Sequence, residues 1–329
     1  MRNFRLIALL FLLMSMGSAA KAQDAAQWMT ITPGGVDEVC ARGTPYSFFV
    51  RQGDPNKLLI FFQGGGGCWN DDTCAPNTGL FDEVVEGNEA GVFTQGIFDA
   101  TNAENPLAGY SIVFVSYCTG DYHLGTQAVE YASGTIQHRG AVDAAAALNW
   151  TFANYPRPQE VVVAGCSAGA IGSIYHTPTI ARRYRSARLT QFGDAGVGVI
   201  NPGWGGFDVW GMRNRRAAPD QVVTALYNSA ARSYPRAHFA QYTTYNDSVQ
   251  TGYYVLTGAV NAWPLEMESR ISGLQRNANF DAYVAPGSEH CIASSNRFYT
   301  EAVEGVRFRD WFAALVAGTP IDSVHCSAC

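Results

Sequence analysis

The pentapeptide Gly165-Cys166-Ser167-Ala168-Gly169 places a hydroxyl where it could act as a nucleophile. It follows the apolar stretch 160–164 and precedes a segment, 170–175, that can begin a helix. A G-x-S-x-G sequence between a strand and a helix is typical of a nucleophile elbow, a strained turn that exposes the serine Oγ and directs the next backbone N–H toward a substrate. The alternative is a turn of small residues without chemistry, which fits the pentapeptide alone equally well.

Four consecutive glycines, Gly64 to Gly67, follow the apolar stretch 57–62. Backbone amides without side chains can closely approach a substrate oxygen, so a glycine loop after an early strand can supply part of an oxyanion hole. A phosphate-binding loop is the alternative. Its spacings, G-x-x-x-x-G-K-[ST] and G-x-G-x-x-G, do not fit, because Cys68, Trp69 and Asn70 occupy the decisive positions.

A serine nucleophile needs a base, and His290 is the best placed of the six histidines. It follows the last apolar stretch, 280–285, and precedes a helical segment. His325 is the second candidate, although it lies in the tail beyond that helix. We expect ordinary surface or hydrogen-bonded core roles for the other four, His123, His138, His176 and His238.

An acid is also needed, to fix the imidazole tautomer and to stabilise the charged imidazole. Two aspartates qualify, because Asp194 follows one predicted strand and Asp247 follows the next. We favour Asp247, which gives the chain order Ser, Asp, His.

Buried apolar stretches alternate with helical segments along the chain. Strand, helix and strand in alternation predict an α/β fold with a mostly parallel, doubly wound sheet. The predicted strands are 57–62, 110–116, 160–164, 188–192, 237–242 and 280–285, and the predicted helices lie at 141–150, from 170 onward and at 308–316.

Residues 201–235 interrupt this alternation with large aromatic residues among glycines. An insertion between late strands can form a cap over a site. We therefore expect a cap-like insertion here, and a substrate pocket with the aromatic surfaces of Trp69, Trp204 and Trp210.

The N-terminus has the pattern of a secretory signal, because Arg2 and Arg5 precede an apolar run, 6–16, and a small-residue ending at Ala22. About 11 apolar residues fall short of the ~20 that a membrane-spanning helix needs. We expect a signal peptide over 1–22, a single domain over 23–329 and secretion to the periplasm or the cell exterior, with no membrane attachment after signal removal.

Charge and cysteine content limit the partners. A net charge of −6 without any run of Lys or Arg argues against nucleic acid and anionic membranes. Arg213, Arg215 and Arg216 form the nearest approach to a cluster, which we interpret as solvated surface, with contact to a sugar acid as the alternative.

All eight cysteines follow the predicted signal, so we expect disulfides. A zinc site is less suitable, because Cys326 and Cys329 form the only C-x-x-C.

Several segments together resemble the pectinacetylesterase family over nearly the whole mature chain. They are 40–46, 58–74 with the glycine loop, Ser116-Tyr-Cys-Thr-Gly-Asp121, the serine pentapeptide, Asp247-Ser-Val-Gln250, His290-Cys291 and the ending with Ile321, Asp322, Cys326 and Cys329.

The resemblance implies an α/β hydrolase with cap-like insertions that removes O-acyl groups, expected to be acetyl, from a polysaccharide or a related ester. It implies a triad of Ser167, Asp247 and His290, and oxyanion-hole amides from Gly65, Gly66 and Ala168. It assigns a structural role to the segment Asp194-Ala-Gly196 and implies no metal or organic cofactor. We also expect a monomer.

The sequence departs from the family pattern at Gly66, where a bulky aromatic residue is common, at Ala170, where the elbow usually continues with Gly, and at Val249, where Trp is common. The glycine loop borders the acyl pocket, so a residue as small as Gly66 could admit an acyl group larger than acetyl. The Cys-Ser, Asp and His-Cys arrangement also resembles that of tannase-like feruloyl esterases, which leaves a feruloyl or polyester hydrolase open. An inactive carbohydrate-binding relative with tryptophan platforms is the alternative of another class.

Cys166 and Cys291 directly adjoin the proposed nucleophile and base. Because Ser167 and His290 must come within hydrogen-bond reach, these neighbours can approach the ~5.5 Å Cα separation of a disulfide. A free buried thiol at Cys166 is the alternative. We expect three further pairs: Cys68–Cys74 beside the glycine loop, Cys40–Cys118 flanking the strands, and Cys326–Cys329.

Overall fold

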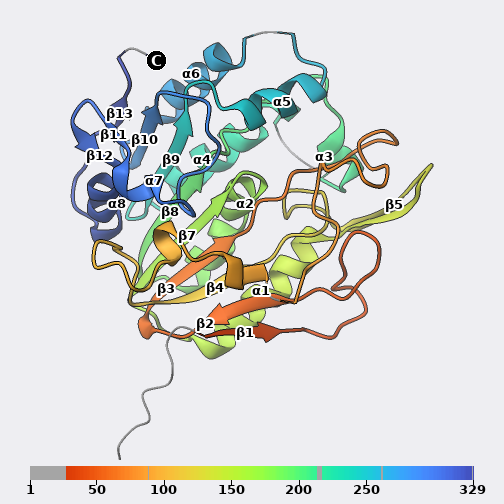
Figure 1. The fold of residues 1–329 in the computed structure, drawn as a ribbon, viewed down its shortest axis with the longest axis horizontal. Coiled ribbons are helices and arrows are strands. Elements are labelled where there is room, and N and C mark those ends of the chain that lie inside the picture. The colour runs from red at the N-terminus through yellow and green to blue at the C-terminus, as the bar shows by residue number, and fades with distance from the viewer. Residues whose placement is uncertain (1–26, 88, 213–216, 261, 328) are drawn as a thin grey trace, which may run out of the picture.

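Nine strands form one central sheet in the order β1-β2-β4-β3-β7-β8-β9-β10-β13 (Figure 1). The structure is a computed structural model that describes residues 27–87, 89–212, 217–260, 262–327 and 329. The predicted signal peptide, 1–22, and the three arginines at 213, 215 and 216 lie outside these residues. The strands are β1 (Trp28–Ile31), β2 (Phe48–Arg51), β3 (Asp54–Phe62), β4 (Tyr110–Val115), β7 (Glu160–Cys166), β8 (Arg188–Asp194), β9 (His238–Thr244), β10 (Phe280–Ala285) and β13 (Val324–His325).

The sheet is parallel from β4 through β3 to β13, and β1 and β2 add an antiparallel edge. Every residue of β4 and all of β3 from Leu58 to Phe62 are buried, as expected for parallel strands covered on both faces. The six predicted strands correspond to β3, β4, β7, β8, β9 and β10. The prediction of an α/β fold with a mostly parallel sheet is confirmed.

Helices cover both faces of the sheet. Gln191 and Phe192 are consecutive in β8 and therefore point to opposite faces. Gln191 donates through Nε2 to Ser173 Oγ of α2, at 2.9 Å, whereas Phe192 packs on Phe312 of α8. The predicted helices are α1 (Gly140–Asn154), α2 (Ala168–Arg183) and α8 (Phe308–Ala317).

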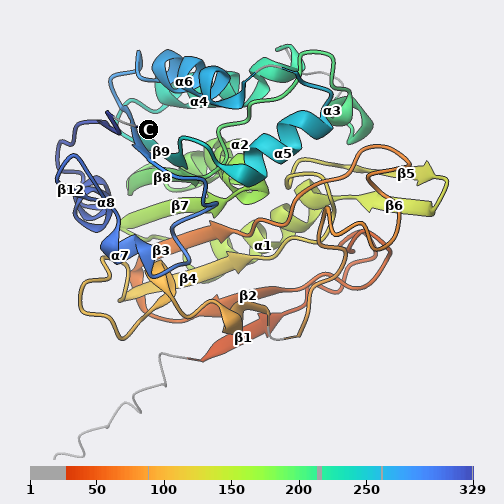
Figure 2. The same ribbon diagram turned by 45° about the horizontal axis from the view of Figure 1, so that its top comes forward.

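The connections after β8 carry the remaining longer helices, α4 (Val222–Ser233), α5 (Ser248–Leu256) and α6 (Trp263–Leu274). Figure 2 shows α4 and α6 side by side beyond β9, and the two helices are in contact. Short elements complete the described chain: α3 (Gly206–Val209), α7 (Arg297–Thr300), η1 (Glu89–Val92), η2 (Gly96–Phe98), η3 (Pro219–Gln221), the hairpin β5 (Gln127–Tyr131) with β6 (Gly134–His138), and the pair β11 (Ala302–Val303) with β12 (Val306–Arg307).

The prediction of a cap over the whole of 201–235 is wrong in its second half. Residues 222–233 form α4, which packs on α2 and β9 as the crossover helix between the parallel strands β8 and β9. Parallel neighbours require such a crossover, which the aromatic and glycine content of the preceding residues obscured. Within the part of the chain that the structure describes, no helix is both long and apolar enough to cross a membrane.

Candidate active site

Ser167 occupies the turn between β7 and α2, with φ 58° and ψ −124°. This left-handed backbone is strained for a residue with a side chain. The flanking glycines make the turn possible, because a Cβ at Gly165 would lie 2.1 Å from the Gly169 oxygen, and one at Gly169 would lie 2.0 Å from the Phe62 oxygen. The turn therefore has the geometry of a nucleophile elbow, as predicted.

Asp247 follows β9 and places its buried carboxylate against His290. The His290 Nδ1 lies 2.8 Å from Asp247 Oδ2 and 3.0 Å from Oδ1. The same carboxylate is the N-cap of α5, because Oδ1 accepts from the amides of Val249 and Gln250 at 3.0 and 2.9 Å. Gln250 Nε2 donates to Oδ2 at 3.0 Å. These donors hold the carboxylate in place, where it can accept a hydrogen bond from the imidazole Nδ1 and so fix the tautomer.

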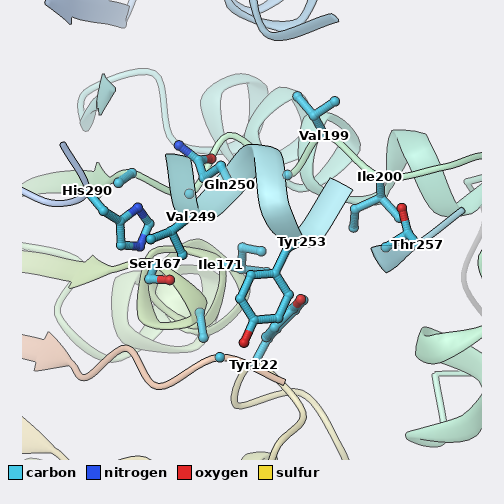
Figure 3. A pocket seen from close by; sticks show the side chains of 15 residues that line it. Tyr122, Ser167, Ile171, Val199, Ile200, Val249, Gln250, Tyr253, Thr257 and His290 are labelled. Carbon is cyan, nitrogen blue, oxygen red and sulfur yellow. The ribbon is translucent and has the colours of Figure 1, made fainter. Parts of the chain in front are cut away.

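The second nitrogen of His290 faces the serine. Figure 3 shows the imidazole beside Ser167, and both residues line the same pocket. His290 Nε2 is buried and has no hydrogen-bond partner among the described residues. Catalytic hydrogen bonds are often long without substrate and tighten in the reacting complex. An acceptor held in this position is suited to receive a proton from Ser167 Oγ.

Asp194, the other candidate acid, holds the loop that carries the histidine. Its carboxylate accepts from the Ile292 amide at 2.9 Å (Oδ2) and 3.1 Å (Oδ1), and from the Ala293 amide at 2.7 Å. Its backbone oxygen accepts from the Ser167 amide at 2.8 Å. Burial raises the pKa of Asp194 to about 7. The residue thus connects the elbow with the His290 loop, which agrees with the structural role that the resemblance assigns to it.

The other histidines do not contribute to this site. Burial lowers the pKa of His123 to about 3 and the pKa values of His138 and His176 to about 4, so all three are neutral core residues. His238 pairs with Asp281, and His325 pairs with Glu268 in the C-terminal segment.

Four disulfides join the eight cysteines, in the four pairs that the sequence predicted. Cys166–Cys291 has a Cα separation of 5.9 Å and connects the elbow to the His290 loop. Cys68–Cys74 and Cys40–Cys118 lie around the glycine loop and the adjoining strands, and Cys326–Cys329 lies near the C-terminus.

The glycine loop passes directly beside the elbow. A Cβ at Gly64 would meet the Cys166 oxygen at 2.8 Å and the Ser167 Cβ at 3.1 Å. The loop is held by hydrogen bonds from the Gly67 amide to the Leu80 oxygen and from the Asp82 amide to the Gly65 oxygen. Within the described part of the chain, the amides of Gly65 and Gly66 have no backbone acceptor. Gly66 and Ala168 line one pocket together with Ser167.

Two spaces meet at Ser167. One is a largely apolar pocket of about 50 Å³, whose walls include Ile171, Val199 and Ile200. The other is an open groove of about 420 Å³ above the glycine loop, which includes Asp82 and Phe93. Val249 and Tyr253 of α5 border both spaces. A nucleophile between a small apolar pocket and a wider groove can separate the two halves of an ester.

The tryptophans predicted for the substrate pocket lie in the core instead. Trp69, Trp204 and Trp210 are 8%, 5% and 0% exposed, and the Trp204 ring packs edge-on against the other two at 5.1 and 5.2 Å. Trp210 Nε1 donates to the Cys68 oxygen at 2.8 Å. None of them lines the pocket or the groove. The prediction was wrong because aromatic residues from separate segments pack on one another and leave no ring face for a sugar.

The structure adds two residues that the sequence did not single out for the site, Gln250 and Tyr253. Gln250 lies within the quoted segment Asp247-Ser-Val-Gln250, so the motif contained its signal. Tyr253 had none, because its place depends on α5, which was not predicted. The space that Gly66 could open to a larger acyl group is occupied, because the Tyr253 hydroxyl lies 2.2 Å from where a Cβ of residue 66 would be.

The parallel sheet, the elbow after β7 and the aspartate and histidine after β9 and β10 define an α/β hydrolase. Its architecture matches that of the Wnt deacylase Notum from Drosophila, with a TM-score of 0.66 over 91% of this chain and 96% of that chain, at 13% identity. The sequence profile described as pectinacetylesterase matches residues 20–304. The chain therefore belongs to the pectinacetylesterase family.

Curated relatives are similar over part of their length. Pectin acetylesterase 7 of Arabidopsis thaliana is 25% identical over 244 residues, which are 69% of this chain and 60% of that protein. Palmitoleoyl-protein carboxylesterase NOTUM of Schmidtea mediterranea is 26% identical over 162 residues, 46% of this chain and 30% of that protein. The matched regions thus span less than two thirds of these relatives.

Proposed function

We propose that this protein is a secreted serine carboxylesterase that removes short acyl groups, acetyl above all, from an acylated polysaccharide. Ser167 is the nucleophile, His290 is the general base and Asp247 orients it. The observation that carries the proposal is the buried Asp247 carboxylate, 2.8 Å from His290 Nδ1, with the imidazole beside Ser167 in a shared pocket.

The reaction proceeds through an acyl-enzyme. His290 Nε2 takes the Ser167 hydroxyl proton as Oγ attacks the ester carbonyl carbon, and Asp247 stabilises the resulting imidazolium. The amides of Gly65, Gly66 and Ala168 donate to the tetrahedral oxyanion. The imidazolium returns the proton to the leaving alcohol as the ester C–O bond breaks. Water then attacks the acyl-enzyme by the same steps, which releases the carboxylic acid and restores Ser167.

The size of the apolar pocket supports a short acyl group. Its volume of about 50 Å³ is one third of the ~150 Å³ in which a six-carbon benzene ring fits. That space suits about two carbons, as in acetyl. A feruloyl group contains a benzene ring and needs a larger pocket, so the structure disfavours the feruloyl alternative. The open groove, with the Asp82 carboxylate among apolar groups, suits the alcohol half of the ester.

A polysaccharide substrate is supported by the family and by the relatives named pectin acetylesterases. Secretion is supported by the predicted signal and by four disulfides, which persist in oxidising compartments. The burial of the three tryptophans argues against the inactive carbohydrate-binding alternative, because their rings are not free to stack on a sugar.

Acetate release from acetylated pectin and acetylated xylan, with p-nitrophenyl acetate as a small substrate, tests the proposal. The wild-type protein should hydrolyse p-nitrophenyl acetate and release acetate from at least one of the two acetylated polysaccharides. A fluorophosphonate should label Ser167. Ser167→Ala removes one exposed oxygen and should abolish hydrolysis and labelling while the protein stays folded. Hydrolysis by the folded Ser167→Ala variant, or labelling at another residue, would refute the assignment.

A further inference from the structure

The small pocket and the wide groove at Ser167 share part of their walls, which includes two side chains of α5. Tyr253 lines both spaces, and Figure 3 shows its ring between Ser167 and Tyr122, with the hydroxyl directed toward the glycine loop. Val249 also lines both spaces, but it is a smaller residue in the first turn of α5. Tyr253 is therefore the largest side chain that the two spaces share.

Tyr253 fits in this position because residue 66 is glycine. A Cβ on Gly66 would lie 2.2 Å from the Tyr253 hydroxyl and 1.9 Å from the Leu80 oxygen. Both distances are far below van der Waals contact. The tyrosine hydroxyl thus occupies the volume next to the glycine loop that residue 66 leaves empty.

Hydrogen bonds fix the tyrosine there. Its hydroxyl donates to the Leu80 oxygen, which also accepts from the Gly67 amide at 3.0 Å. The loop around Leu80 is thus joined both to the glycine loop and to α5. The N-cap of α5 is Asp247, so the helix that carries this wall is also anchored by the residue that orients His290.

Tyr122, which also lines the pocket, is packed into the core. Tyr122 is 8% exposed, and its ring packs edge-on against Trp210 at 4.8 Å. Its amide donates to the Tyr117 hydroxyl at 2.9 Å. A longer acyl chain cannot displace Tyr122 without disturbing the tryptophan cluster, whereas Tyr253 is only partly buried.

We propose that Tyr253 determines the acyl-chain length by closing the pocket at Gly66, where a chain longer than acetyl would otherwise pass into the groove. This inference rests on the proposed esterase function and names the residue that restricts its substrates. Removal of the ring should join the pocket of about 50 Å³ to the groove of about 420 Å³. The kcat/KM should increase for esters with long acyl groups, because the acetyl group already fits the wild-type pocket.

The test compares kcat/KM for p-nitrophenyl acetate, butyrate and octanoate in the wild type, Tyr253→Ala and Val255→Ala. Val255 lies on the same helix, is 60% exposed and lines neither space, so it controls for changes in α5. Each methylene in a hydrophobic pocket changes kcat/KM by ~10–200-fold. The octanoate-to-acetate ratio should therefore rise at least ~10-fold in Tyr253→Ala and stay at the wild-type value in Val255→Ala.

Active sites are counted by fluorophosphonate titration, so that a loss of folded enzyme does not distort the ratios. Tyr253→Leu, which keeps an apolar side chain, provides the same comparison if the alanine variant does not fold, and its ratio should rise in the same direction. Unchanged ratios in the folded Tyr253 variants, with normal acetate hydrolysis by the wild type, would refute the role of Tyr253 alone. If the folded wild-type protein hydrolyses no ester, the proposed function fails together with this inference.

Discussion

Cys166 and Cys291, the chain neighbours of Ser167 and His290, are joined by a disulfide with a Cα separation of 5.9 Å. The bond therefore fixes the distance between the elbow and the histidine loop directly at the proposed catalytic residues. Its two cysteines are 125 residues apart in the sequence. For a loop of this length the chain-entropy model gives a stabilisation of about 5 kcal/mol, an upper estimate.

We expect the double substitution of Cys166 and Cys291 by serine to lower both stability and turnover. His290 would be held only by Asp247 and by the amide contacts of its loop, and a displacement of about 1 Å can cost ~10²-fold in rate. Urea denaturation and kcat for p-nitrophenyl acetate measure the two effects. The matched control replaces Cys326 and Cys329, which close a short loop in the C-terminal segment. Equal effects of the two double substitutions would contradict the positioning role of Cys166–Cys291.

Asp247→Asn should reduce kcat by about 10⁴-fold with little loss of stability. Asparagine is as good an N-cap as aspartate, so α5 should persist, but the amide cannot hold the imidazole in the required tautomer. Asp194→Asn should have the reverse profile. It weakens the acceptor of the Ile292 and Ala293 amides and should mainly lower the free energy of unfolding. Kinetics and urea denaturation of both variants decide the assignment, and a folded but inactive Asp194→Asn with an active Asp247→Asn would reverse it.

Asp143 of α1 should make the protein less stable as the pH rises. It is 2% exposed, and burial raises its pKa from 3.8 to about 9, with the carboxylates of Asp121 and Glu38 adding to the shift. Between these pH values the folded protein keeps a proton that the unfolded chain releases. The free energy of unfolding therefore falls with rising pH, by up to ~1.4 kcal/mol per pH unit for this one group.

Asp143→Asn removes that titration, so the variant should gain stability relative to the wild type as the pH increases from 5 to 8. Buried Asp121 and Asp194, with pKa values raised to about 6 and about 7, titrate in the same direction in both proteins. The contribution of Asp194 cancels when the variant and the wild type are compared, and that of Asp121 cancels as long as Asp143 stays protonated, below its pKa of about 9. Urea denaturation at a series of pH values gives the difference, and a constant difference across this range would contradict the assignment to Asp143.

Much of the fold could be predicted because parallel strands buried on both faces leave continuous apolar stretches, such as Leu58–Phe62 in β3. The serine could be predicted because its backbone needs glycines at fixed positions. Asp247 could be separated from Asp194 only by chain order and resemblance, since both follow strands. The structure separates them by their partners, an imidazole for Asp247 and backbone amides for Asp194.

Contacts between distant segments were beyond the reach of the sequence. The absence of a side chain at Gly66 suggested a wide pocket, yet Tyr253 approaches from α5 and fills the space. The local sequence around each tryptophan also does not show whether the residue is buried in the core or exposed to bind a sugar. Their burial results from Trp69 and Trp204 meeting from different parts of the chain, at 5.1 Å between rings.

Trp204 should therefore behave as a core residue when it is substituted. Its ring contacts Trp69, Phe207 and Trp210 at centroid distances of 5.1, 4.9 and 5.2 Å. Trp204→Ala should cost ~3–5 kcal/mol of the free energy of unfolding, as large-to-small core changes do. Trp204→Phe keeps an aromatic ring and should cost less. The KM for acetylated polysaccharide should remain near the wild-type value in Trp204→Phe, because the Trp204 ring lines neither the pocket nor the groove and a phenyl ring can still pack against Tyr122. Urea denaturation and polysaccharide kinetics on the same samples provide both values. A variant with wild-type stability and a raised KM would instead indicate that Trp204 binds the carbohydrate.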